Sequence, residues 1–560
     1  MIYIKTIKMK QYIYKGLKTK LIVAFVAGVT LFSCAKKLDL YPLDQYANDI
    51  FWTSEANVNI ALTALYKGNI QMQKSAEFSP TDWWSYNGLI FLEFATDNAY
   101  DRRGDNSNFN KLTNGTLTSN VGDYPNYWVN SYSRIARCNY FLENIDKAVS
   151  VSETTKERTK SEARFLRAAQ YLYLSTYFGA VPLITKVLRP AEANQVTKTP
   201  LAEVQAFVET ELTAAAAGLP NAAKLPASER GRATRQAALA FLGRLYLTME
   251  NWQQAATTYK TIIDFNENSI DPDYASLFNG TNESSKEIIF ATQYVVDLAP
   301  NGMLQHFYPA MAAGWGIFCP LGSLAESYDF NDGSAFSYGS PLYKAGDFTA
   351  NRDPRLAYNI LCNNMLFKGK PYISHPDSTA SPDQLTLSKQ ATRTGYSMRK
   401  FSYDGFSGGD LQNSGIDLPI IRYSEVLLSY LEAEIHLGTI DQALLDATIN
   451  KVRGRASVAM PPVKETNAGG LLPILKKERR NELAFEGIRL WDLYRWKDAV
   501  TLLNGDFYGA SFPGAKSLRK APAGAADPNS RWYVTTKAFK AANYPWPVPQ
   551  SEVNNNPNLK

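Results

Sequence analysis

The chain has 560 residues, of which 45% are hydrophobic and 20% charged, a composition typical of globular proteins that excludes intrinsic disorder. The formal net charge is +6, and the same number of lysines precedes an apolar run near the N-terminus: Lys5, Lys8, Lys10, Lys15, Lys18 and Lys20. Without these lysines the chain is close to neutral, so its charge gives no support for binding nucleic acid.

The apolar run Leu21–Ser33 follows these lysines and is too short to cross a bilayer comfortably, which is the pattern of a secretory signal peptide. We therefore expect residues 1–33 to be removed. The run ends in Leu-Phe-Ser before Cys34, which resembles the lipobox of bacterial lipoproteins. Two or more acyl chains on Cys34 would hold the protein on a membrane, whereas a plain secreted protein with an unmodified Cys34 is the alternative.

The remaining cysteines, Cys138, Cys319 and Cys362, are odd in number and have no CxxC spacing. They predict small buried thiols rather than a disulfide framework or a zinc site. No later stretch approaches twenty uninterrupted apolar residues, so the sequence predicts a protein that is anchored to a membrane without crossing it.

Helical spacing dominates the chain up to about residue 268. A first helix is expected after the capping candidates Thr53 and Ser54, and two longer ones over 127–148 and 162–178, the second stopped by Gly179. Small and aromatic residues then fall at the spacings of a tetratricopeptide unit: Leu242, Gly243, Tyr246, Ala255 and Tyr259. A weaker, partial match involves Gly438 and Ala443.

These patterns predict a mainly α fold, a tetratricopeptide-like helical repeat scaffold over about 50–268 and 418–500. Residues 269–417 are instead rich in glycine, proline, asparagine and aromatic residues, with strand-like runs such as 287–294. We interpret them as a long, irregular, loop-rich insertion that carries binding residues on a rigid support. Residues 501–560 are expected to close irregularly over the scaffold.

The stretch 476–498 (KKERRNELAFEGIRLWDLYRWKD) has two apolar stripes at helical spacing and opposite charges three residues apart. It is therefore predicted to be one buried helix with a ladder of ion pairs. Gly487 is unfavourable inside a helix by about 1 kcal/mol relative to alanine, which indicates a close approach by another part of the chain. We interpret this helix as a brace of the scaffold rather than an active site.

The run ERRNELAFEGIRLWDLYRWK closely resembles the C-terminal signature of the SusD/RagB family of surface nutrient-binding lipoproteins. The lipobox, the first helix, the segment YFGAVPL and the ending YPWPVP are also similar to those of SusD-like chains. The resemblance implies one SusD-like domain over 34–560, lipid-anchored at the cell surface on the outer membrane. It also implies capture of an oligosaccharide, such as a starch-type glycan, for a SusC-like TonB-dependent transporter.

Motifs of catalysis and metal binding do not emerge from the sequence. The three histidines have no HExxH or GxSxG partner, and the DFNDG run at 329–333 has no glutamate at the end of an EF-hand loop, which favours a simple turn. We therefore expect a binding protein without enzymatic activity, cofactor or metal site, while leaving open a structural calcium ion.

Sugars offer flat apolar faces and hydroxyl rims, so their sites combine aromatic rings with fixed polar groups. Two stretches provide both, and the resemblance places ligands on loops from these two regions. The predicted ligand-binding residues are Trp83, Asp97, Asn98, Tyr100, Arg102, Tyr308, Trp315 and Phe318. The same residue types would serve a peptide, as in RagB-like members, and a tetratricopeptide adaptor for protein partners is a third, different class.

Overall fold

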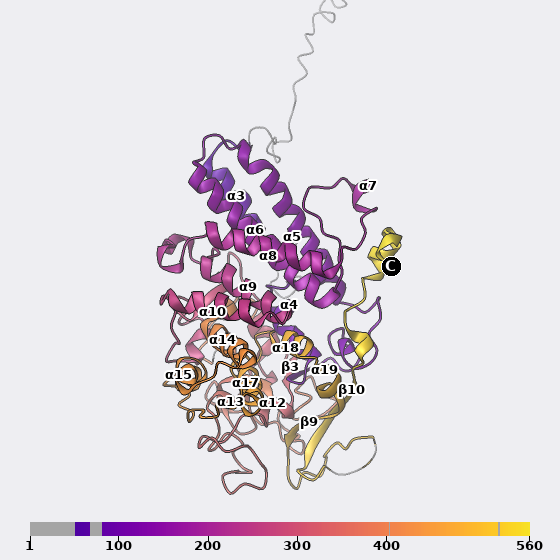
Figure 1. Cartoon of the computed structure of the whole chain (residues 1–560). Coiled ribbons are helices and arrows are strands. Elements are labelled where there is room, and N and C mark those ends of the chain that lie inside the picture. The colour runs from indigo at the N-terminus through magenta and orange to yellow at the C-terminus, as the bar shows by residue number, and fades with distance from the viewer. Residues whose placement is uncertain (1–50, 68–80, 403, 523, 525–526) are drawn as a thin grey trace, which may run out of the picture. The chain divides into compact units, whose positions relative to one another are not determined.

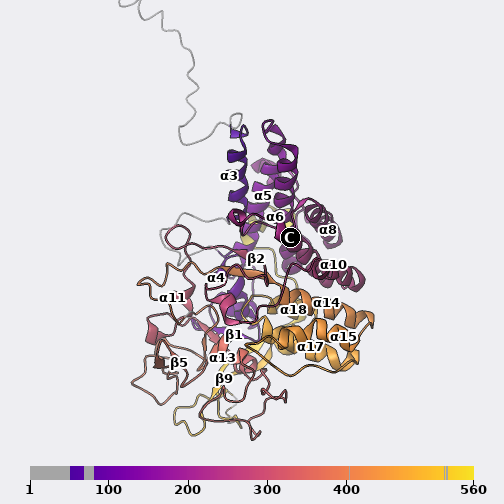
Figure 2. The same cartoon turned by 90° about the vertical axis from the view of Figure 1, so that its left-hand side faces the viewer.

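The chain before the insertion folds into helices that pack on one another in succession (Figures 1 and 2). This computed structural model describes residues 51–560 apart from residues 68–80, 403, 523 and 525–526, so the predicted signal peptide and Cys34 lie outside the described residues. The helices are α3 (Glu55–Tyr66), α4 (Tyr86–Leu89), α5 (Tyr124–Asn144), α6 (Glu153–Phe178), α7 (Pro190–Ala193), α8 (Leu201–Gly218), α9 (Arg235–Thr248) and α10 (Trp252–Asp264).

Local sequence signals set the ends of these helices. The Ser152 hydroxyl accepts a hydrogen bond from the Thr155 amide at the start of α6, and α6 ends at Gly179, whose φ is +73°. Helix α5 packs on α6, α6 on α8, α8 on α9 and α9 on α10. The scaffold is therefore a chain of neighbouring helix pairs. Each helix predicted before residue 269 overlaps an observed one, although α6 starts nine residues earlier than expected.

The helices α9 and α10 show why small residues matter at their contact. A Cβ atom added to Gly243 would lie 2.4 Å from the ring of Tyr259, so only glycine lets this tyrosine fill the space between the two helices. The packing expected for this pair is therefore present. That the successive pairs follow tetratricopeptide geometry stays a prediction.

Residues 269–417 contain only short elements among long connections, as predicted. Strand β2 (Ile288–Thr292) lies in the predicted strand run and pairs antiparallel with β8 (Leu418–Arg422), so the two ends of the insertion lie side by side. The other elements are α11 (Met303–Phe307), β3 (Phe318–Pro320), α12 (Gly322–Ala325), α13 (Arg355–Asn359), β4 (Ile360–Leu361), β5 (Leu366–Phe367), β6 (Lys370–Pro371) and β7 (Ser397–Met398).

The chain returns to the scaffold after β8. Helix α14 packs on α10 and then on α17, which extends the helical array (Figure 1). The elements are α14 (Tyr423–Leu437), α15 (Gln442–Ala447), α16 (Ile449–Arg453), α17 (Ala468–Glu482), α18 (Arg489–Arg495) and α19 (Ala499–Leu502). Helix α14 ends at Gly438 in the left-handed region, and that stop position is visible in the sequence.

The C-terminal segment is more regular than predicted. Strands β9 (Asn504–Ser511) and β10 (Arg531–Ala538) form an antiparallel pair with two register shifts, so the expectation of a wholly irregular closing segment is wrong. The alternation of buried and exposed residues that marks a strand is weak here, because β10 is buried along most of its length. After β10 come irregular chain and helix α20 (Gln550–Asn555).

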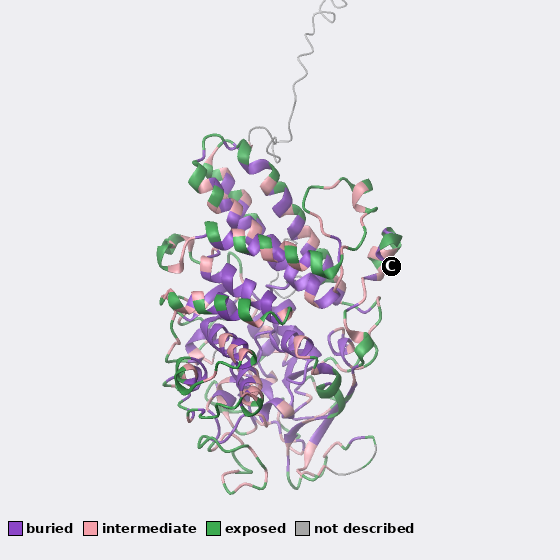
Figure 3. Ribbon diagram, viewed as in Figure 1, coloured by how far each residue is buried: buried purple, intermediate pink, exposed green. Residues whose placement is uncertain are grey.

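Trp546, in this last irregular stretch, is 1% exposed and packs deep in the scaffold. Its ring stacks on Tyr177 of α6 with centroids 4.8 Å apart, and the ring of Trp83 stacks on Tyr177 at 5.1 Å. The Trp546 indole nitrogen donates a hydrogen bond to the Tyr494 hydroxyl at 3.0 Å. The tail therefore completes an aromatic core. Figure 3 shows that buried residues concentrate in the interior, where helices and strands pack on one another.

The stretch 476–498 is not one helix, which corrects the sequence prediction. Helix α17 ends at Glu482, and α18 starts at Arg489 after a turn in which Phe485 and Gly487 have φ of +65° and +73°. A Cβ atom on Gly487 would lie 2.4 Å from the Leu89 carbonyl oxygen. The close approach inferred from the glycine is real, but it occurs in a turn.

The predicted ladder of ion pairs within this stretch is also mostly absent. The four predicted pairs are Arg479–Glu482, Glu486–Arg489, Arg489–Asp492 and Asp492–Arg495. Only the last forms, at 2.7 Å. The charges instead contact other elements, because the turn directs them away from one another. Arg479 of α17, for example, reaches Asp492 of α18 at 3.1 Å and holds the two helices together.

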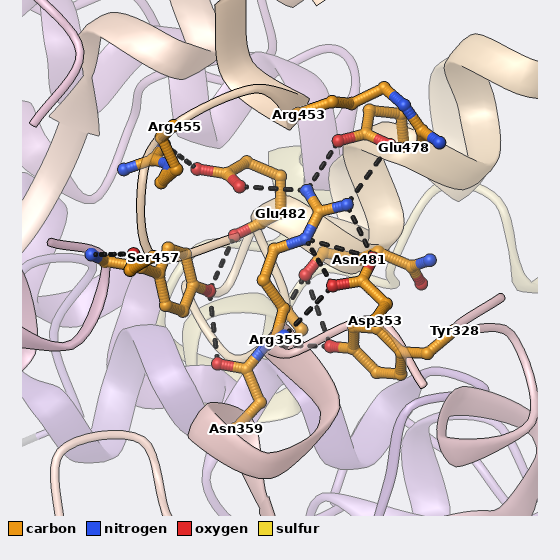
Figure 4. A network of polar contacts seen from close by, with 12 residues as sticks. Tyr328, Asp353, Arg355, Asn359, Arg453, Arg455, Ser457, Glu478, Asn481 and Glu482 are labelled. Atoms are coloured by element: carbon orange, nitrogen blue, oxygen red, sulfur yellow. Dashed lines mark hydrogen bonds and ion pairs between the residues drawn. The ribbon is translucent and has the colours of Figure 1, made fainter. Parts of the chain in front are cut away.

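Glu478 and Glu482 of α17 lie at the centre of a buried network of alternating charges (Figure 4). Glu482 accepts from Arg455 at 2.6 Å and from Arg355 and Arg422 at 3.1 Å each. Burial alone would raise the pKa of Glu482, but Arg455, Arg422 and Arg355 together lower it to about 2. The network joins α17 to α13, β8 and the chain after α16, which is the role of a brace.

Candidate functional site

The structure brings together the two sequence stretches that were expected to bind a ligand. Strand β1 (Ala99–Asp101) from the first stretch pairs antiparallel with β3 from the second, with Tyr100 opposite Cys319 and Asp101 opposite Phe318. The pairing continues one residue further, since the Arg102 amide donates to the Ile317 carbonyl at 2.9 Å. Residues more than two hundred positions apart thus form one small sheet, and we call the surface around its Arg102–Ile317 end the β1–β3 face.

Trp315 lies next to this end on a firmly held turn. Its amide donates to the Gln305 carbonyl at 2.7 Å, and the next two amides donate to Tyr308 and His306. A Cβ atom on Gly314 would lie 2.2 Å from the Tyr308 carbonyl oxygen, so the turn closes tightly only because this residue is glycine. The half-buried Trp315 side chain is therefore presented on a rigid loop, which suits an aromatic contact surface.

The ring of His306 packs against the ring of Trp315. The two rings meet edge to face with centroids 4.9 Å apart, and His306 Nδ1 is 2.9 Å from the Tyr86 hydroxyl. Burial lowers the pKa of His306 to about 4, so this imidazole is neutral near pH 7. His306 accordingly acts as a fixed packing partner, which the sequence alone did not reveal because the histidine has no motif around it.

Arg102 and Arg103 at the end of β1 have different surroundings. Arg103 is tied to the buried carboxylate of Asp101, with its Nη2 2.7 Å from Oδ2. Arg102 is half-buried, makes no ion pair with any residue that the structure describes, and has a buried Nε atom without a partner there. Burial lowers the pKa of Arg102, and the nearby charge of Arg393 acts in the same direction. One of the two neighbouring guanidinium groups is therefore available to a ligand.

Arg393 was not among the predicted residues. Its amide donates to Cys319 Sγ at 3.3 Å, which places its backbone against β3. The sequence offers no signal for this proximity, because Arg393 lies some seventy residues after β3 in a stretch without regular periodicity. The β1–β3 face thus combines a half-buried indole with more cationic groups than the sequence indicated.

The other six predicted residues are buried, and each has a structural role here instead of a surface for ligand contact. Trp83, Tyr308 and Phe318 are 0% exposed, and Asp97, Asn98 and Tyr100 are 4%, 0% and 5% exposed. Aromatic and polar residues in loops look the same in sequence whether they face solvent or the interior. Burial leaves Arg102 and Trp315 as the predicted residues that a ligand can reach in this structure.

Two of the buried polar residues, Asp97 and Asn98, are satisfied by the signature stretch. Asp97 binds Arg489 at 2.9 Å and Arg480 at 3.0 Å, and Asn98 Oδ1 accepts from Arg480 Nε at 2.8 Å. Tyr100 donates its hydroxyl proton to Asp105 at 2.9 Å. The signature stretch therefore holds in place the residues just before β1, the strand that Arg102 follows.

Two further observations concern metals and membranes. Within residues 51–560, apart from the gaps given above, no three or more His, Cys, Asp or Glu side chains are grouped so as to hold a metal ion. Asp329 of the expected turn is paired with Lys477 at 2.6 Å. Over the same residues, no helix combines the length and hydrophobicity that crossing a membrane requires.

Comparisons with known proteins agree with this arrangement. The family model described as "SusD family" matches residues 277–560, and one described as "Starch-binding associating with outer membrane" matches residues 85–247. A SusD-like carbohydrate binding protein of Bacteroides fragilis NCTC 9343 has a similar structure, with a TM-score of 0.88 and 44% identity, covering 91% of this chain and 100% of that one.

More distant relatives also match most of the chain. SusD-like protein P2 of Formosa agariphila is 25% identical over 493 residues, which are 85% of this chain and 90% of the relative. A second SusD-like protein of B. fragilis NCTC 9343 has a TM-score of 0.76 at 24% identity and covers 93% of this chain and 99% of that one. The two family models together include both sides of the β1–β3 pairing, and the relative that is 44% identical covers 91% of this chain; the chain therefore belongs to the SusD family.

Proposed function

We propose that this protein captures an oligosaccharide at its β1–β3 face and delivers it to a SusC-like TonB-dependent transporter in the outer membrane. The observation that carries the proposal is that Arg102 and Trp315 both lie at one end of the β1–β3 pairing, which joins two distant stretches of the chain. An indole plane offers apolar contact to the C–H face of a sugar ring, and an unpaired guanidinium offers hydrogen bonds to its hydroxyls. Membership of the SusD family supports the choice of a carbohydrate as ligand.

The mechanism is binding without bond cleavage. Trp315 is fixed by backbone hydrogen bonds of its turn and by the ring of His306, so little conformational freedom is lost when a ligand arrives. Asp101 lies close by, but it is fully buried and paired with Arg103. The nearest carboxylate is thus occupied in an ion pair instead of being presented to a ligand.

Lipidation of Cys34 would fix the protein at the cell surface, and the transporter would take over the bound ligand. Cys34 lies in a sequence similar to a lipobox, and the description of the matching family model names the outer membrane. This part of the proposal predicts that the protein fractionates with the outer membrane and that Cys34→Ser releases it into the soluble fraction.

The proposed site can be tested by calorimetry on the protein from residue 35 onward with a panel of neutral and charged oligosaccharides. We expect at least one to bind, and we expect Trp315→Ala to weaken binding about tenfold or more, since truncating a tryptophan at the centre of a binding site costs about 2 kcal/mol or more. Arg102→Gln should weaken it by a similar factor, because a hydrogen bond from a charged group contributes about 1.5–3 kcal/mol.

Trp252→Ala is the matched control. Trp252 is also half-buried, but it lies on α10 and stacks on His436 with centroids 3.8 Å apart. Unchanged affinity in both Trp315→Ala and Arg102→Gln would disprove the site assignment. Binding of peptides but of no oligosaccharide would replace the ligand class with the RagB-like one, and binding of neither would favour the protein adaptor.

A further inference from the structure

A pocket of about 300 Å³ lies between the insertion and the C-terminal segment, and neither Trp315 nor Arg102 lines it. This volume is at the lower end of the range for small-molecule sites, about 300–1,000 Å³. Three chain segments form its walls: the loop around Tyr343 and Phe348, the segment from Cys362 to His375, and the end of β9 with Phe512; Tyr396 completes the lining. Exposed rim residues such as Gly346 and Pro513 leave it open to solvent.

The pocket has aromatic walls in fixed orientations. Phe348 and Tyr396 are 5.8 Å apart between centroids, and Tyr343 and Phe348 are 6.3 Å apart with their planes at 77°. Phe512 is held edge to face by His375, with centroids 5.2 Å apart. Rings at steep angles to one another provide flat apolar surfaces on more than one side, which suits a compact ligand with apolar faces.

Two polar side chains of the pocket are preorganised by the backbone. Asn363 Oδ1 accepts hydrogen bonds from the amides of Ser374 at 2.8 Å and His375 at 3.1 Å. This fixes the amide group, while its Nδ2 donates to no residue that the structure describes. His375 Nδ1 accepts from the Asp377 amide at 3.2 Å, an arrangement that leaves Nε2 as the ring atom that can donate a proton to a ligand. Both groups therefore keep an N–H donor for a ligand.

The lining contains no charged side chain among the described residues. Asp377 lies close to His375, but its carboxylate accepts from the amides of Lys516 and Ser517 at 2.8 and 3.0 Å. Arg352 lies 4.8 Å from the centroid of the Phe348 ring, but it does not line the pocket, and its guanidinium donates to the carbonyls of Ala325 and Tyr328. A charged ligand group would therefore lose hydration without an ion-pair partner in the lining, which is costly. The chemistry of the walls therefore selects an uncharged ligand that has both apolar faces and hydrogen-bonding groups.

We propose that this pocket binds one uncharged pyranose unit, and so forms a second saccharide site beside the β1–β3 face. Tyr343, Phe348 and Phe512 contact the ring faces, and Asn363 Nδ2 and His375 Nε2 donate to its hydroxyls. Arg393 of the first site and Tyr396 of the pocket are three residues apart, at most about 11 Å along the chain. The inference rests on the proposed function only in taking a carbohydrate as the ligand.

The test uses saturation-transfer NMR with methyl α-D-glucopyranoside, methyl α-D-mannopyranoside and methyl β-D-galactopyranoside, together with methyl β-D-glucuronide as the charged counterpart. The protein carries Trp315→Ala throughout, so that the first site does not contribute. We expect a signal for at least one neutral glycoside and none for the glucuronide. Asn363→Asp should reduce the neutral signal at least about fivefold, because it replaces the donor and keeps the two acceptor contacts that hold the loop.

Asn194→Asp, an exposed change in the loop after α7, is the matched control and should leave the signal unaltered, with melting temperatures compared for all variants. An equal signal in Asn363→Asp, a stronger signal for the glucuronide, or no signal from any neutral glycoside would each overturn the proposal. Failure of the proposed function is distinguished by the calorimetry described above. There, it would appear as an oligosaccharide affinity that Trp315→Ala leaves unchanged.

Discussion

Arg489 holds both carboxylate oxygens of Asp97, with Nε 2.9 Å from Oδ1 and Nη2 3.0 Å from Oδ2. Arg489 begins helix α18 in the signature stretch, and Asp97 lies just before β1. Arg480 of α17 reaches the same carboxylate at 3.0 Å. The signature is thus linked to the β1–β3 face by a buried charge cluster, although none of its own side chains is part of that face.

Asp97→Asn should be strongly destabilising. It leaves the guanidinium groups of Arg480 and Arg489 buried without their carboxylate, and removal of one partner from a buried ion pair costs about 3–5 kcal/mol. Urea unfolding followed by circular dichroism would measure the change in the free energy of unfolding. The same substitution at Asp498, whose partner Lys476 is 28% exposed, should have a much smaller effect. Equal losses at both positions would contradict this account.

Gly487→Ala tests the turn that separates α17 from α18. The alanine would have to adopt the unfavourable φ of +73°, and its methyl group would clash with the Leu89 carbonyl oxygen at 2.4 Å. Gly514→Ala has a similar φ of +80° with no atom within 4 Å, so it reports the backbone cost alone, about 1–2 kcal/mol. We expect Gly487→Ala to lower the melting temperature clearly further. Similar shifts for the two variants would mean that the contact with Leu89 is unimportant.

The buried ammonium group of Lys537 in β10 should make the free energy of unfolding depend on pH. Its ammonium group donates to the carbonyl oxygens of Phe94 and Thr96, and burial lowers its pKa to about 7, opposed by the charges of Asp97 and Asp105. Between about pH 7 and the ordinary lysine pKa, the unfolded chain holds a proton that the folded protein has lost. The free energy of unfolding should therefore rise with pH in this window, by up to about 1.4 kcal/mol per pH unit.

Lys537→Met removes this titration. We expect the variant to show a shallower rise in unfolding free energy than the unmodified protein when urea unfolding is compared at pH 7, 8 and 9. Lys400, whose pKa burial lowers to about 8, contributes a rise in the same direction in both proteins, so only the difference between the slopes is informative. Parallel slopes would show that Lys537 does not titrate in this range.

Helices were predictable from the sequence where apolar spacing and terminal signals agree. Gly179 was predicted to stop α6 and does so by its backbone conformation, whereas the start at Ser152 was missed, because the expected helix began at residue 162. The break at Gly487 was missed because the stretch has uninterrupted helical spacing on both sides of it. In the turn that follows α17, Gly487 lies close to Leu89, nearly four hundred residues earlier, and no local pattern records such an approach.

The candidate site was predictable in its location and only partly in its residues. The aromatic and polar stretches around Arg102 and Trp315 meet as expected, whereas Trp83 and Tyr308 are core residues. Exposure depends on what packs against a side chain, and for Trp83 the partners include Trp546 from the other end of the chain. The pocket around Asn363 was not foreseen, since its walls come from three segments with no shared motif.

The aromatic core of Trp83, Tyr177 and Trp546 joins residues at opposite ends of the chain. During synthesis, Trp83 and Tyr177 emerge long before Trp546 exists, so their stacking surfaces stay uncovered until the polypeptide is almost complete. Contacts of such large sequence separation form late and slow the final folding step. A chain shortened by its last few tens of residues would therefore expose apolar rings in the middle of its helical scaffold, and quality control by proteases could recognise an incomplete molecule by that surface alone.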